Sequence, residues 1–304
     1  MSTDVAAAAG GASGAGDAAV AEPIRVPGSA RSWLRLLGSE LRLIFRRWRN
    51  LALIGVLVVI PVILGIGLKV STPHGGGGGG PAASFIAQLA GNGVFLAFLA
   101  LTIMLTLVLP LVVAVVSGDS IAGESGHGTL RYLLTVPAGR TRLLIVKYTA
   151  VVIFGLVSCL VVAVVSLIMG LILFPVGPVT LLSGTTVSLA DGLLRLLYVT
   201  LFLAAAMAAL GAIGLAISTL TEHAIGAIAA ILVLTVASEV ADNVSQFAAI
   251  HPYLPTHFWL SFDSLLRSPI ATGDLLHSLL SFAVYIVIFG TIAWARFTSA
   301  DVTS

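Results

Sequence analysis

The chain has 304 residues, of which 58% are hydrophobic and 9% are charged, and its formal net charge is +2. Soluble domains are about 45–50% apolar and about 25% charged, so this composition excludes an ordinary soluble enzyme and argues against a nucleic-acid partner. A mean hydropathy of +1.11 indicates that lipid is the main solvent. The length suffices for several membrane spans, but it leaves no room for an ATPase domain beside them.

The N-terminal region is expected to be a disordered tail, residues 1–28, followed by a surface helix, residues 29–50. The tail is rich in Ala and Gly and contains few large apolar side chains, so it cannot bury enough surface to become ordered. In the next segment, apolar and basic side chains alternate at helical spacing, which predicts a helix lying flat on the membrane. Its apolar face comprises Trp33, Leu37, Leu41, Ile44 and Trp48, and its basic face includes Arg42 and Arg46.

This surface helix has two interpretations. It is either an anchor that sets topology, or it also contacts a cytoplasmic partner. Glu40 and Arg47 fall near the apolar side, where neither interpretation expects a charge.

Six apolar stretches follow, and each approaches the about 20 residues that a helix needs to cross roughly 30 Å of hydrocarbon. Pro61 and Pro110 lie within two of them and are expected to kink their helices, because proline lacks an amide donor and clashes one turn back. The predicted spans are Leu51–Leu68, Val94–Val116, Tyr148–Phe174, Gly192–Ile217, Ala224–Val240 and His277–Ala295.

The distribution of arginine and lysine predicts the orientation of these spans. Basic residues concentrate before the first span, between the second and third spans, and at the C-terminus. Cytoplasmic loops retain such residues preferentially, so both termini are expected in the cytoplasm of a plasma-membrane protein. Residues 51–297 would then form the six-span domain and residues 298–304 a cytoplasmic tail.

The connection between the second and third predicted spans reads as a short capped helix. Thr129 can cap its start, Leu130, Leu133 and Leu134 form one apolar stripe, and Pro137 prevents continuation. An apolar stripe on a short helix in water needs a cover, which a groove on a cytoplasmic subunit would supply. The alternative is a loop packed on its own helix bundle.

This segment resembles the cytoplasmic signature of ABC-2 type transporter permeases. In that family an acidic residue precedes a Gly-Thr helix, a Pro-x-x-Arg turn and a lysine. The resemblance implies that the loop is a coupling helix on an ABC ATP-binding subunit, that ATP and Mg are held by that subunit, and that two permease copies or paralogues form the path. The residues that carry it are Glu124, Gly128, Thr129, Leu130, Leu133, Leu134, Pro137, Arg140 and Lys147.

The chain itself contains no G-x-x-x-x-G-K-[ST] phosphate loop, so no cofactor is expected on it and an ATPase is expected in trans. A secondary transporter or channel would predict intramembrane ionisable groups and inverted repeats, and neither is found. A membrane hydrolase is suggested only by Gly123–Gly126, which matches the G-x-S-G string of rhomboid proteases. No predicted span interior contains a histidine that could act as its base.

The segment between the last two predicted spans contains His251 and His257, which a metal site or simple interfacial placement would explain. Glu239 and Asp242 are either a solvated helix cap or a polar lining of the exit route. The stretch Phe258–Leu266 is expected to dip partway into the membrane. The predicted fold is thus an all-α membrane protein with six transmembrane helices, an amphipathic interfacial helix and a short cytoplasmic coupling helix.

Overall fold

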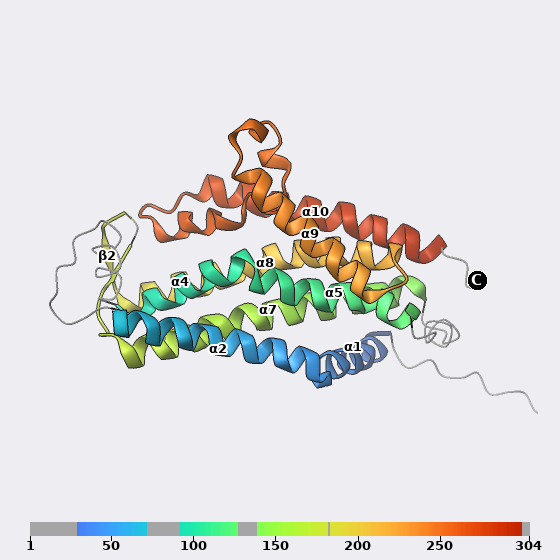
Figure 1. The fold of residues 1–304 in the computed structure, drawn as a ribbon, viewed down its shortest axis with the longest axis horizontal. Coiled ribbons are helices and arrows are strands. Elements are labelled where there is room, and N and C mark those ends of the chain that lie inside the picture. The colour runs from blue at the N-terminus through green and yellow to red at the C-terminus, as the bar shows by residue number, and fades with distance from the viewer. Residues whose placement is uncertain (1–28, 72–91, 127–138, 182, 300–304) are drawn as a thin grey trace, which may run out of the picture.

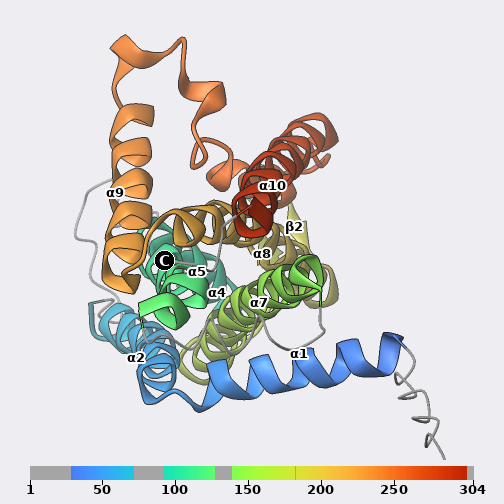
Figure 2. The same ribbon diagram turned by 90° about the vertical axis from the view of Figure 1, so that its right-hand side faces the viewer.

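A computed structural model describes residues 29–71, 92–126, 139–181 and 183–299. Long helices lie along one axis, and the first helix crosses one end of the resulting bundle (Figures 1 and 2). A two-stranded antiparallel ribbon lies near the other end. We call these the α1 end and the ribbon end. The helices are α1 Ser29–Arg46, α2 Trp48–Ser71, α4 Gly93–Thr106, α5 Val108–Gly126, α7 Arg140–Leu173, α8 Leu189–Leu220, α9 Ala224–Asp242 and α10 Thr272–Ser299; the strands are β1 Val179–Thr180 and β2 Thr186–Val187.

Five of these helices, α2, α7, α8, α9 and α10, are each long and apolar enough to cross a membrane. Helices α4 and α5 pass the same criteria only together, and they bend by 52° where they meet. The expected kink at Pro110 is therefore confirmed. Pro110 lies one turn after Thr106, the last residue of α4, and it has no amide to donate to the Thr106 carbonyl. In contrast, α2 continues as one helix through Pro61.

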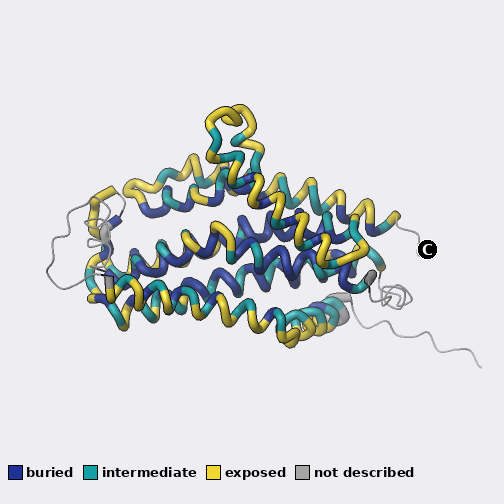
Figure 3. Tube along the Cα trace, viewed as in Figure 1, coloured by how far each residue is buried: buried dark blue, intermediate teal, exposed yellow. Residues whose placement is uncertain are grey.

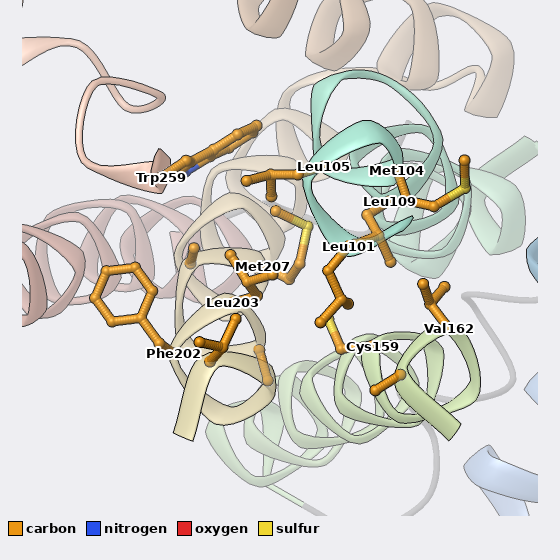
Figure 4. Packing of buried hydrophobic residues seen from close by; sticks show 14 of the residues in the cluster. Leu101, Met104, Leu105, Leu109, Cys159, Val162, Phe202, Leu203, Met207 and Trp259 are labelled. Carbon is orange, nitrogen blue, oxygen red and sulfur yellow. The ribbon is translucent and has the colours of Figure 1, made fainter. Parts of the chain in front are cut away.

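Helix α8 occupies the centre of the bundle, and its side chains are mostly buried, whereas α2, α9 and α10 expose many large apolar side chains (Figure 3). Such outward apolar surface is what lipid contact requires. The core forms where α4, α5, α7 and α8 meet (Figure 4). It includes Leu101, Met104, Leu109, Cys159 and Met207, and Cys159 is a free, buried thiol.

Helices α4 and α7 approach closely at a pair of glycines. A Cβ atom added to Gly93 at the start of α4 would collide with the backbone of Gly170 in α7, and the reverse also holds. Only glycine permits this approach, as at the small-residue contacts common between membrane helices.

The chain between α9 and α10 forms three short 3₁₀ helices, η1 Ser245–Phe247, η2 His251–Tyr253 and η3 Trp259–Leu266. The first part projects sideways from the bundle (Figure 1, orange). In η3, Trp259, Phe262, Leu265 and Leu266 are buried in the main core beside α8 and α10. Arg195 of α8 fixes its end by donating hydrogen bonds to the carbonyls of Leu265 and Arg267.

Candidate functional site

A buried ammonium group lies at the α1 end, where α1, α5 and α7 meet. The side chain of Lys147 on α7 is only 2% exposed, and its Nζ lies 2.6 Å from Oε1 of Glu124 on α5. The same Nζ lies 3.4 Å from Oε1 of Glu40 on α1. Because a buried charge is tolerated only when it is paired, these two carboxylates are what allows a lysine at this position.

A second ionic contact joins the start of α2 to α5. Asp119 forms an ion pair with Arg47, which lies between α1 and α2, and its Oδ2 is 3.0 Å from Nη2 of Arg49. The Arg47 contact is also a hydrogen bond, whereas Arg49 lacks hydrogen-bond geometry and contributes only charge. Together with the first contact, it links α1, α2 and α7 to α5, whose Asp119 and Glu124 take part.

The two contacts enclose a small cavity of about 30 Å³, which is enough for one water molecule. Asn50 is buried beside it, and its Nδ2 donates 2.9 Å to the carbonyl of Ile44 while its Oδ1 lacks a partner among the described residues. The walls of the cavity are formed by Glu40, Leu43, Ile44, Arg47, Asn50, Val116, Asp119, Ser120, Glu124 and Lys147.

The structure places two residues of the predicted coupling segment. Glu124 belongs to the ionic contact above, and Arg140 begins α7, where its Nη1 donates 2.9 Å to the carbonyl of Thr298 at the end of α10. The other predicted residues lie within residues 127–138, outside the described part of the chain. They are Gly128, Thr129, Leu130, Leu133, Leu134 and Pro137.

The predicted surface helix ends earlier than the sequence suggested. Helix α1 stops at Arg46, and Trp48 instead starts α2, where it is 81% exposed. The chain turns between the two helices, since α1 crosses the bundle and α2 follows its axis (Figure 2). The side chain of Asn50 donates a hydrogen bond to the carbonyl of Ile44, which the end of α1 leaves without a helical partner.

The apolar side of α1 packs on α7. Leu37 is buried against Val146 and Ala150, with Trp33, Leu41 and Ile44 around it. Arg42 and Arg46 are exposed. Glu40 and Arg47, whose positions the sequence pattern left unexplained, are the residues that reach Lys147 and Asp119.

The acidic residues at the end of α9 form a separate cluster. Oδ1 of Asp242 lies 2.6 Å from Nδ1 of His257 and 3.9 Å from Nδ1 of His251. The His277 ring packs against Phe258, with their ring centroids 5.3 Å apart. Among the described residues, no three His, Cys, Asp or Glu side chains are placed to hold a metal ion. The contacts fix the segment that follows α9 to its end.

A bundle with five helices long and apolar enough to cross a membrane defines a helical, multi-pass membrane protein. Residues 79–303 match the model of a family described as "Protein of unknown function (DUF2705)", and the chain belongs to this family. A comparison with curated proteins found no match.

Proposed function

We propose that this protein is the permease subunit of an ABC exporter, driven by ATP that a separate subunit hydrolyses. Its six spans would count α4 and α5 as one bent span, and both termini would lie in the cytoplasm, as the basic residues predict. Two copies or paralogues would form the path. Its cargo would be hydrophobic or amphipathic, such as a drug, lipid or peptide, because the spans carry few fixed charges.

One observation supports this proposal most directly: Lys147 and Glu124, two residues of the resemblance, form a 2.6 Å ion pair. They lie on either side of the predicted coupling helix, at the end of α5 and near the start of α7. The pair therefore holds the two stems of that connection together, as a loop that transmits force from an ATPase would need. Glu40 extends the same contact to α1.

The decisive experiment is to purify the complete chain alone and with candidate ATP-binding subunits, and to compare ATP hydrolysis and complex formation. We expect no hydrolysis by the chain alone, a stable complex with one such subunit, and hydrolysis that rises when cargo is added. The variant Lys147→Met should weaken the complex at least tenfold, whereas Asp263→Asn, which removes an exposed pair with Arg267, should not. ATP-independent, gradient-driven transport by the chain alone would instead identify a secondary transporter.

A further inference from the structure

Helix α1 has one acidic residue, and that residue faces the bundle. Glu40 lies 3.4 Å from Nζ of Lys147. In contrast, Arg35, Arg42 and Arg46 are exposed, and no ion pair within the described part of the chain includes them. Their spacing of seven and four residues places them on one side of the helix, opposite Leu37, which is buried on α7. We call these three residues the arginine face.

The arginine face lies where lipid headgroups would be. Helix α1 runs across the end of the bundle, whereas α2, α7 and α8 run largely along the viewing direction (Figure 2). It is therefore parallel to the surface of any membrane that those helices cross. Exposed apolar side chains accompany the arginines: Leu34 is 62% exposed, Leu43 is 55% exposed, and Trp48 just beyond the helix is 81% exposed. Tryptophan beside arginine is typical of the boundary between acyl chains and headgroups.

We propose that the arginine face binds the phosphate groups of anionic phospholipids, and that this binding holds α1 against α7. Arginine suits such a ligand because its guanidinium matches a phosphate with two parallel hydrogen bonds. A lipid partner is favoured over an acidic protein because the exposed Leu and Trp side chains need an apolar cover next to the anion.

Lipid binding to α1 would affect the ionic contact around Lys147, because α1 carries Glu40. The side that contacts lipid and the side that carries Glu40 belong to the same rigid helix, so a lipid that fixes the helix also keeps Glu40 beside Lys147. Anionic lipid would thus stabilise the ionic contact at the α1 end. Each arginine near a charged membrane surface contributes about fivefold in affinity, so the three together contribute about 100-fold.

The test uses the complete chain in nanodiscs of phosphatidylcholine alone or with phosphatidylglycerol, and it measures amide exchange over residues 33–46. Phosphatidylglycerol should slow exchange there in the wild type at least tenfold, and added salt should reduce the effect. The variant Arg35→Gln/Arg42→Gln/Arg46→Gln should lose this response while it still inserts. Arg42→Gln alone should weaken the response. Its control is Arg296→Gln, which also removes one exposed arginine, in the last turn of α10, and which should keep the full response.

Three results would overturn the proposal. Equal exchange in both lipids would show that α1 does not sense lipid charge. An unchanged response in the triple variant would place the lipid contact elsewhere. Protection by inorganic phosphate added to phosphatidylcholine nanodiscs would indicate a site for a free anion. Because neither an ATPase nor a cargo enters this experiment, its outcome is independent of the proposed transport function.

Discussion

The hydroxyl of Ser218 on α8 donates a hydrogen bond of 2.8 Å to the carbonyl of Gly118 on α5. It also accepts from the amides of Ile121 and Ala122, at 3.1 Å and 2.9 Å. The Gly118 carbonyl and the Ala122 amide are the acceptor and donor positions of one i to i+4 hydrogen bond of α5, and the hydroxyl bonds to both of them. It does so one turn before Glu124, and it thereby fixes the α1 end of α5 to the central helix.

The substitution Ser218→Ala should destabilise the protein by about 1–3 kcal/mol, because it removes a buried hydroxyl that serves three backbone groups. Denaturant unfolding in detergent measures this loss, and the amides of Ile121 and Ala122 should exchange faster. The matched control is Ser166→Ala, because Ser166 is equally buried but bonds only to Val162 of its own helix. Equal effects of the two substitutions would contradict a special role for Ser218.

The ionic contact around Lys147 should show strong coupling between its members. The variant Glu124→Gln leaves the buried ammonium with only the longer contact to Glu40 and should cost about 3–5 kcal/mol. The double variant Glu124→Gln/Lys147→Met removes both charges, and its cost should fall short of the sum of the single variants by about 1–3 kcal/mol. Asp263→Asn, at an exposed pair, should change stability by less than about 0.5 kcal/mol. If the effects of Glu124→Gln and Lys147→Met on stability were additive, a direct Glu124–Lys147 interaction would be contradicted.

The predicted apolar stripe in residues 127–138 gives a functional prediction. Leu133→Asp would place an unpaired carboxylate in the expected contact with the ATPase, at a cost of about 1–3 kcal/mol or more. The complex should weaken and ATP-driven transport should fall, while insertion is unchanged. Thr135→Asp adds the same charge to the same segment off the stripe and should have a much smaller effect. Pull-down with the ATPase measures the complex, and a transport assay measures function. Normal complex formation and full transport by Leu133→Asp would contradict a coupling role for this segment.

Cysteine labelling tests the predicted orientation. In a Cys159→Ala background, cysteines introduced within residues 75–80 should react with an impermeant reagent in intact cells. Cysteines at Ser125 or Thr303 should react only after permeabilisation, because basic residues near both positions favour the cytoplasm. Labelling of Ser125→Cys from outside would reverse the orientation and place the predicted coupling segment away from any ATPase.

The sequence by itself determined the apolar spans, because hydrophobicity acts along one helix. It predicted bends at both Pro61 and Pro110, and the structure breaks the helix only at the second. The sequence also indicated a helix before the first span, although not that this helix ends at Arg46. Only the tertiary structure decided which charges meet. Glu40 and Lys147 are 107 positions apart, and Ser218 and Gly118 are 100 positions apart. Contacts of this kind depend on how helices cross and rotate against one another, which local periodicity does not specify. For the same reason, the pattern of an isolated helix did not explain the charges of Glu40 and Arg47. Their ion-pair partners lie on other helices, Lys147 on α7 and Asp119 on α5.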